Sequence, residues 1–147
     1  MRGALALADE AARLGEVPVA AIVVHQGEVL GRGFNRKESG DPTAHAEMIA
    51  IREAAARIGD WRLHETTLYT TLEPCLMCAG AILQARVGRI VYGAADPKFG
   101  AVESLLRVFE RPWNHRPQID GGVLAAESAQ RLRAFFAERR KTADNKA

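Results

Sequence analysis

An uninterrupted apolar run at residues 17–24 is the sequence feature that most restricts the possible folds of this chain. The run is far shorter than the ~20 apolar residues that a helix needs to span a bilayer, so the sequence predicts no membrane contact. It ends in the polar turn of residues 25–27, which is typical of a buried strand that leads into a hairpin. The core is therefore expected to form around a β-sheet.

Helical and strand-like patterns alternate along the rest of the chain. Apolar residues at helical spacing, followed by a glycine, predict a first helix at residues 4–15. Strands are expected at residues 17–24, 28–34, 66–72, 89–93 and 118–119. A second helix is expected to begin at Pro42, with Thr43 as N-cap, and a third at Pro74, which is suited to an early helical position. Two further helices are expected at residues 104–109 and from Val123 to about Lys141. This order predicts an α/β fold, a three-layer α/β/α sandwich. Its five-stranded mixed sheet would be flanked by helices and would begin with two antiparallel strands.

Length and charge limit the organisation of the chain and its partners. At 147 residues it is expected to form one domain that spans residues 1–147. Its formal net charge of +2 neither requires nor excludes a nucleic-acid partner. Residues 131–147, however, hold six Lys and Arg residues against two Asp and Glu, which predicts a basic C-terminal helix and tail from about residue 131.

Cys75 and Cys78 are the two cysteines of the chain, too few for a disulfide framework. The expectation that follows is a reducing, cytoplasmic setting, with both thiols available for metal binding or catalysis. Their spacing places both sulfurs on one face at the start of a helix, where the helix N-terminus stabilises the metal-binding thiolate. His45 is expected in the first turn of the preceding helix, and both helix starts follow the carboxyl ends of strands, where α/β proteins form their sites. Two thiolates and an imidazole suit zinc.

The number of available ligands favours a catalytic zinc site. A structural zinc ion takes four protein ligands, whereas a catalytic one keeps a position for water. A fourth ligand would have to come from a histidine at no recognisable ligand spacing, namely His25, His64 or His115. Glu47 lies two residues after His45, so it cannot chelate along the same helical face, but it is suited to act as general acid and base on the metal-bound water.

The pattern His-x-Glu followed by Pro-Cys-x-x-Cys is the signature of zinc-dependent nucleoside and nucleobase deaminases. Over nearly its whole length, the chain resembles the bacterial tRNA-specific adenosine deaminases within that superfamily. The resemblance runs through residues 16–19, 33–36, 41–47, 68–75, 80–81, 92–94, 96–101, 114–116, 135–136 and 139–140. The metal motif alone indicates a deaminase. The matching segments outside that motif are what indicate a tRNA substrate.

This resemblance implies an enzyme that hydrolyses adenosine to inosine at the wobble position of the tRNA anticodon and releases ammonia. It implies one zinc ion per subunit on His45, Cys75 and Cys78, with Glu47 as proton shuttle for a zinc-activated water. It also implies a cytidine deaminase-like fold, a homodimer, and the anticodon stem-loop of tRNA as partner. The substrate-binding residues that it implies are Asn35, Ala46, Asp96, His115, Phe136 and Arg140. Of these, Asn35 is expected to bind the flipped-out base and Asp96 the sugar of the target nucleotide.

Two departures from the family lie near the expected substrate. Ala20 replaces a glycine that often follows Val-Pro-Val, and the loop at residues 110–113 looks shortened and altered. The first position is expected to narrow the floor of the pocket. The second lies where loops would meet RNA, so it bears on the choice of tRNA.

Other interpretations of the same residues stay open. The substrate could instead be a free base or nucleotide such as guanine or cytosine, and the zinc could serve only to stabilise an interaction module. Asn35 and Asp96 are also common in turns, and cations at residues 139–141 would suit the end of any helix. Of the adjacent Phe135 and Phe136, one is expected to pack inward, while the other stacks on RNA bases or contacts a neighbouring element.

Overall fold

The computed structural model describes residues 1–146 of the chain. Within that range, a five-stranded sheet has the strand order β2-β1-β3-β4-β5. The strands are β1 (Ala20–His25), β2 (Glu28–Phe34), β3 (Thr67–Leu72), β4 (Arg89–Ala94) and β5 (Gln118–Asp120). β1 pairs antiparallel with both β2 and β3, whereas β3, β4 and β5 run parallel. The mixed sheet predicted from the sequence is confirmed.

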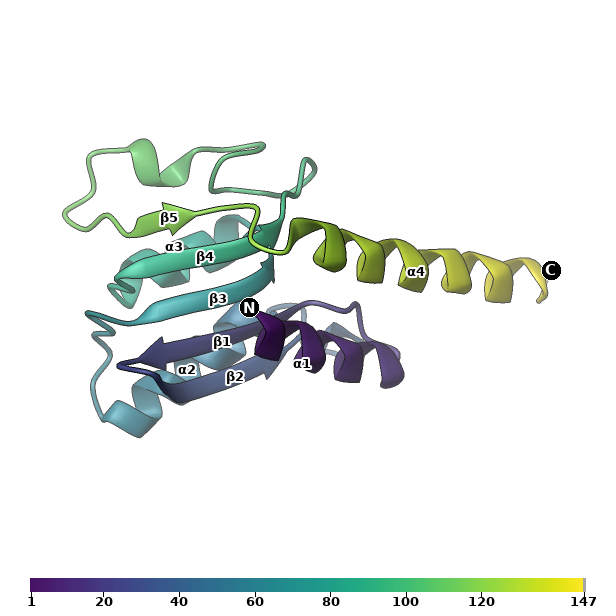
Figure 1. Ribbon diagram of the computed structural model, residues 1–147, viewed down its shortest axis with the longest axis horizontal. Coiled ribbons are helices and arrows are strands. Elements are labelled where there is room, and N and C mark those ends of the chain that lie inside the picture. Colours follow the sequence, from purple (N-terminus) through teal and green to yellow (C-terminus); the bar gives the residue numbers. More distant parts are fainter. Residues whose placement is uncertain (147) are drawn as a thin grey trace.

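Helices cover both faces of this sheet (Figure 1). They are α1 (Arg2–Arg13), α2 (Ala46–Ile58), α3 (Leu76–Gln84) and α4 (Ala125–Asp144). α1 and α4 lie on one face and α2 and α3 on the other, which confirms the predicted three-layer α/β/α sandwich. Between residues 1 and 146, no helix is both long enough and apolar enough to cross a bilayer.

The start of α2 differs from the prediction. The helix begins at Ala46 with His45 as its N-cap, and not near Pro42 with Thr43 as N-cap. The reason is a local turn, because the side chain of Asp41 accepts hydrogen bonds from both the backbone N–H and the hydroxyl of Thr43, at 2.8 and 2.7 Å. These bonds give the residues ahead of His45 an alternative to the helix.

The predicted helix at residues 104–109 is wrong. Residues 101–104 form turns, and only the short 3₁₀ helix η2 (Val108–Glu110) follows them. The buried carboxylate of Glu73 accepts hydrogen bonds from the backbone N–H groups of residues 102–104, which bends this segment around a side chain far away in the sequence. Local sequence patterns do not predict hydrogen bonds of this kind.

Other boundaries lie a few residues from the predicted ones. Cys75 is the N-cap of α3, so Pro74 precedes the helix and does not occupy its first position. β1 begins at Ala20, after a tight turn in which the N–H of Val19 bonds the carbonyl of Val17. α4 begins at Ala125, two residues later than predicted.

Two glycines let α2 lie directly on β2. A Cβ atom at Gly31 would collide with the carbonyl oxygen of Ala50, and one at Gly33 would collide with that of Ala46. Alanines on the facing side of α2, Ala46 among them, are fully buried. Because α2 begins at the residue after His45, this close packing also sets the position of His45.

α4 packs closely against the sheet only near its start. A Cβ atom at Gly93 of β4 would collide with the hydroxyl of Ser128, and among the described residues of α4 only Ser128 is buried. The rest of the helix extends past the edge of the sheet (Figure 1). The basic segment predicted from about residue 131 therefore lies on a largely exposed helix.

Replacing Gly31 with alanine should destabilise the fold, because α2 would have to move away from β2. We expect Gly31→Ala to lower the free energy of unfolding by about 3 kcal/mol, the upper range for overpacking, as measured by urea denaturation. Gly3→Ala is the matched control, since Gly3 lies in α1 and a Cβ atom there meets only the flexible tip of Ile22. Equal stability of the two variants would contradict this account of the α2–β2 contact.

Candidate active site

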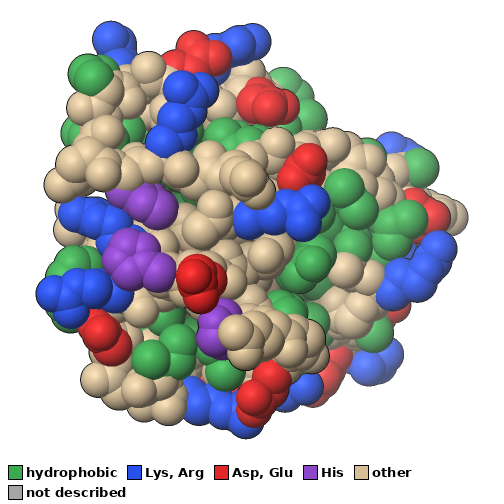
Figure 2. All heavy atoms as spheres, turned by 60° about the vertical axis from the view of Figure 1, so that its left-hand side comes forward, with side chains coloured by type: hydrophobic (Ala, Val, Ile, Leu, Met, Phe, Trp, Pro, Cys, Tyr) green, Lys and Arg blue, Asp and Glu red, His purple; other side chains and the backbone are tan. Residues whose placement is uncertain are grey.

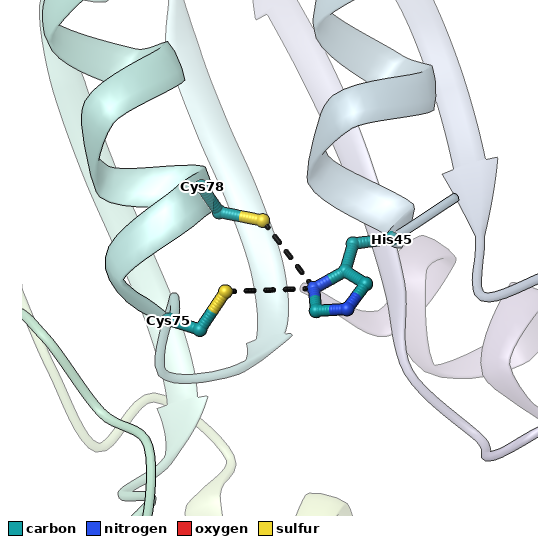
Figure 3. Close-up of side chains that lie close together, drawn as sticks. All are labelled: His45, Cys75 and Cys78. Carbon is teal, nitrogen blue, oxygen red and sulfur yellow. Dashed lines mark hydrogen bonds between the residues drawn. The ribbon is translucent and has the colours of Figure 1, made fainter. Parts of the chain in front are cut away.

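Two helix starts meet beyond the carboxyl ends of the strands. His45 is the N-cap of α2, immediately ahead of the first turn in which the sequence predicts it. Cys75 is the N-cap of α3, and Cys78 lies in the first turn of that helix. Figure 3 shows the three side chains converging, with Nδ1 of His45 lying 3.5 Å from Sγ of Cys75 and 3.6 Å from Sγ of Cys78. All three potential ligand atoms lie within 4.8 Å of one another.

The spacing and chemistry of these atoms fit a zinc ion. Tetrahedral zinc binds sulfur at ~2.3 Å and nitrogen at ~2.0 Å, which puts a sulfur and a nitrogen ligand ~3.5 Å apart. The neighbouring Cys78 thiol lowers the pKa of Cys75 to about 4; burial opposes this shift and His45 adds to it. Cys75 is thus a thiolate at neutral pH, the form of cysteine that binds metals. The group is compatible with zinc and offers three potential ligand atoms.

Glu47 is a buried carboxyl group beside this cluster, with only 3% of the residue exposed. Its Oε1 accepts a hydrogen bond of 3.0 Å from the hydroxyl of Thr70, and its Oε2 one of 3.5 Å from the thiol of Cys78. Burial raises the pKa of Glu47, because the charged carboxylate loses the water that would stabilise it. A carboxyl group with a raised pKa is suited to accept and return a proton near neutral pH.

A cavity of about 300 Å³ connects these groups to solvent. Its lining residues are Val19, Asn35, Lys37, His45, Glu47, Leu72, Glu73, Cys75, Asp96 and Phe99. Protein sites for small molecules span roughly 300–1,000 Å³, so this cavity suits a ligand about the size of one nucleobase.

Asn35 follows β2 and faces this cavity from the α2 side. Its Oδ1 accepts a hydrogen bond of 3.0 Å from the backbone N–H of Ala46. That bond fixes the orientation of the amide and leaves its NH₂ group as the end available to a ligand. Ala46 is fully buried, its N–H is already donated to Asn35, and it is not among the residues that line the cavity, although the sequence predicts it to bind substrate.

Asp96 lines the opposite side of the cavity. Its Oδ1 accepts hydrogen bonds from the backbone N–H groups of Lys98 and Phe99, at 3.0 and 3.2 Å. Asp96 is therefore both a turn-forming residue, as its sequence context allows, and a residue of the candidate site.

Glu73 has a structural part in the site that the sequence analysis did not assign. It is almost fully buried, and it accepts hydrogen bonds from the backbone of Asp96 at 2.9 Å and of residues 102–104. Burial opposes ionisation of Glu73, but the hydrogen bonds, led by that of the Ser104 hydroxyl, outweigh it and lower its pKa. The available signal was its place directly before Pro74 and Cys75 in the metal motif, although nothing in the sequence shows what it contacts. Thr70, Lys37 and Phe99 were also not assigned.

Phe136 and Arg140 lie outside the cavity, on the exposed part of α4. Arg139 bonds Glu38 at 3.2 Å, which brings this part of α4 beside the 3₁₀ helix η1 (Lys37–Ser39) and hence beside the cavity wall at Lys37. The ring of Phe135 lies under the Arg139 guanidinium, 4.9 Å from its carbon, while Phe136 is exposed.

His115 is not brought to the cavity. Its Nε2 lies 2.7 Å from the carbonyl oxygen of Val87, just ahead of β4, and its ring packs edge-on against His64. His115 thus lies at the amino ends of β4 and β5, whereas the cavity lies beyond the carboxyl ends. Figure 2 brings the amino-end side of the molecule forward and shows histidine side chains exposed there among Lys or Arg and acidic groups.

Comparison with curated proteins places the chain among deaminases that act on tRNA. Residues 1–140 match the family model of the MafB19-like deaminases. The "tRNA-specific adenosine deaminase" of Haemophilus influenzae is 49% identical over 144 residues, which cover 96% of this chain and 83% of that protein. A Deinococcus radiodurans protein named "tRNA(Ile)-lysidine synthase" is 52% identical over 147 residues, and this chain spans only a quarter of its length, 25%.

Solved structures agree with these relatives. A structure from a study of "A-to-I Editing by tRNA:A34 Deaminases at the Wobble Position of Transfer RNA" is 48% identical, has a TM-score of 0.84, and covers 88% of this chain and 95% of that one. A guanine deaminase from Bacillus subtilis is 41% identical with a TM-score of 0.61, over 64% of this chain and 61% of that one. By the family match and the near-full-length relatives, the chain belongs to the family of tRNA-specific adenosine deaminases.

Proposed function

We propose that this chain hydrolyses adenosine to inosine at the wobble position of a tRNA anticodon and releases ammonia. The observation that carries the proposal is the cavity lined by Asn35, Asp96, Glu47, His45 and Cys75, with the buried Cys78 completing the cluster of potential ligands behind it. The 48% identity to a solved structure from work on tRNA:A34 deaminases supports the choice of substrate. A tRNA substrate implies a cytoplasmic setting, and we take residues 1–147 to be one deaminase domain.

We further propose that one zinc ion per chain is bound by His45, Cys75 and Cys78. The support is the match between their spacing, with sulfur and nitrogen atoms 3.5 and 3.6 Å apart, and the edges of a tetrahedral zinc site. When bound, zinc supplies a Lewis acid that lowers the pKa of water to about 7, so that a nucleophile is available at neutral pH.

Glu47 moves the protons of the reaction in this proposal. Its carboxylate accepts a proton from the attacking water and delivers it to the adenine ring nitrogen as oxygen adds to C6. It then takes the hydroxyl proton from the oxygen on C6 and gives it to the amino group, so that the C=O bond forms as the C6–N bond breaks and ammonia leaves. The Thr70 hydroxyl holds one carboxyl oxygen, which fixes the direction from which Glu47 works. The free NH₂ group of Asn35 donates a hydrogen bond to the base, and Asp96 lies where the sugar of the target nucleotide would pass.

An anticodon loop is a favourable substrate for such a cavity, because its bases are already unpaired and the target base can be turned out at low cost. We assign Phe136 and Arg140 on α4 to contacts with the RNA outside the cavity, an aromatic ring for stacking and a cation for phosphate. His115 lies at the other end of the strands, and we assign it to a contact with a more distant part of the tRNA.

The first test compares two substrates. The purified chain is incubated separately with unmodified tRNA and with guanine. The tRNA nucleosides are then separated and identified by mass spectrometry, and released ammonia is measured in the guanine sample. We expect inosine at the wobble position and no ammonia from guanine, with Glu47→Gln as the inactive control. Ammonia from guanine without inosine in the tRNA would favour the free-base alternative, which the resemblance to the B. subtilis guanine deaminase raises.

The second test separates metal binding from proton transfer. Cys75→Ser should reduce the zinc content from about one ion per chain to near zero, because a hydroxyl is a poor replacement for a thiolate ligand. Glu47→Gln should keep the zinc and lose about 10²–10⁴-fold in kcat, the usual contribution of a general acid and base. Full zinc content in Cys75→Ser, by elemental analysis, would refute the ligand assignment. Undiminished turnover in Glu47→Gln would refute the proton shuttle.

We also propose that the chain forms a homodimer through the outer side of α3 and the loop that follows residue 104. Exposed apolar side chains gather there, with Leu76, Leu106 and Trp113 lining two adjoining hollows. Leu76 is 57% exposed although it directly follows the ligand residue Cys75. A second copy covering this surface would shield both the apolar residues and the helix start that carries the cluster.

The dimer is tested by sedimentation equilibrium. We expect twice the mass of the chain, and we expect Leu76→Arg to raise the dimer dissociation constant at least ~100-fold, since a charge buried in an apolar contact is strongly unfavourable. Leu14→Arg is the matched control, because Leu14 is exposed to a similar extent, 65%, but lies at the end of α1. A monomeric wild type, or a dimer that Leu76→Arg leaves intact, would contradict this interface.

A further inference from the structure

Phe99 is both highly exposed and part of the cavity wall. Its side chain is 69% exposed, more than that of any other large apolar residue between residues 1 and 146. It also lines the cavity that is lined by Glu47, His45 and Cys75. A single exposed apolar residue is ordinary on a protein surface, so its position at the cavity mouth is what gives it meaning.

The backbone that carries Phe99 is held firmly. The N–H of Phe99 and that of Lys98 both bond the side chain of Asp96, and the N–H of Gly100 bonds the Asp96 carbonyl oxygen at 2.8 Å. Asp96 in turn donates its own N–H to the buried carboxylate of Glu73, at 2.9 Å. The ring is therefore presented by a closed turn.

The same turn is tied directly to the candidate metal cluster. Gly100 forms a β-bridge with Cys75, and the N–H of Ala101 bonds the carbonyl of Pro74 at 2.8 Å. A Cβ atom at Gly100 would collide with the Glu73 carboxylate, so this approach requires glycine. Phe99 thus has a fixed place relative to the atoms that would act on the substrate.

We infer that Phe99 is a stacking surface for the nucleobase next to the target adenosine in the RNA strand. The inference rests on the proposed function, because only a polynucleotide has a neighbouring base. When the target base turns into the cavity, the base beside it loses a stacking partner at the cavity mouth. An aromatic ring held at that mouth replaces the lost partner, and it accepts any base because every base has an aromatic face.

Charges at the cavity mouth fit a nucleic-acid strand. Lys98 is exposed directly beside Phe99, and Lys37 lines the cavity. Two cations near an exposed ring match the combination of phosphate contacts and base stacking by which proteins bind single-stranded nucleic acids. A cavity dedicated to a free base would gain nothing from a ring that points mostly into solvent.

The test measures kcat and KM for inosine formation in an anticodon stem-loop RNA. We expect Phe99→Ala to raise KM about ten-fold, the usual scale of losing one stacked base, with kcat changed less than about two-fold. Phe99→Tyr should restore the wild-type KM and Phe99→Leu should not, because leucine keeps the apolar surface but offers no ring. Leu14→Ala is the control, since Leu14 is 65% exposed and lies away from the cavity.

Abasic RNAs identify the stacked nucleotide. When the base on one side of the target is removed, wild type and Phe99→Ala should have the same KM. Removing the base on the other side should leave the ten-fold difference in place. If neither abasic RNA abolishes the difference, or if Phe99→Ala lowers kcat and leaves KM unchanged, Phe99 does not stack on a flanking base.

The wild-type enzyme distinguishes failure of this inference from failure of the proposed function. Inosine formation by wild type with equal KM for Phe99→Ala overturns the stacking role alone. No inosine from wild type, with ammonia released from guanine, overturns both. Zinc content and circular dichroism of each variant confirm that a change in KM comes from an intact protein.

Discussion

The site depends on the exact placement of two helix starts, and the packing of α2 on β2 determines the first of them. Gly31 and Gly33 leave no side chain between the strand and the helix, so the backbone of α2 lies against that of β2. This contact places His45 at the edge of the sheet and directs Glu47 into the protein. It also lets Asn35, directly after β2, bond the N–H of Ala46. One backbone contact therefore orients His45, the buried carboxyl group of Glu47 and the amide of Asn35.

A buried carboxylate holds the other half of the site together. Glu73 lies between β3 and Cys75, and its oxygens accept hydrogen bonds from Asp96 and from residues 102–104. A buried charge is unfavourable unless it is hydrogen-bonded, so the bonds from this segment offset the cost of burying the Glu73 carboxylate. As a result, the segment that carries Asp96 and Phe99 is built onto the same residues that position Cys75. The floor and the mouth of the cavity are parts of one hydrogen-bonded unit.

The sequence was most informative where short-range patterns decide the structure. The alternating helices and strands, the Cys-x-x-Cys spacing and the His-x-Glu motif predict the layers of the fold and the residues that converge in the cavity. Prediction failed where a distant side chain captures the backbone, as Glu73 does in the segment predicted to be a helix at residues 104–109. The start of α2 was also predicted wrongly, here for a local reason. The side chain of Asp41 binds the N–H of Thr43 and so holds this segment in a turn instead of a helix. His115 shows a third limit, since only the strand order reveals that it lies at the opposite end of the sheet from Cys75.

In this fold, the residues proposed to carry out the reaction and those proposed to select the substrate lie in different surroundings. His45, Cys75, Cys78 and Glu47 lie at helix starts packed against the sheet, where the surrounding core tolerates little change. The chain resembles both a solved tRNA:A34 deaminase and a guanine deaminase, at 48% and 41% identity, and the TM-score falls from 0.84 to 0.61 between them. Substrates as different as a free base and a folded RNA can share such a cluster, because both present an amino group on a ring carbon. What must differ is whatever contacts the rest of the substrate. In this chain the candidates are the exposed side chains of residues 97–99 and the outer part of α4, which contribute little to the core. These side chains can vary while the backbone bonds of the turn, which involve Asp96 and Gly100, keep the cavity in place.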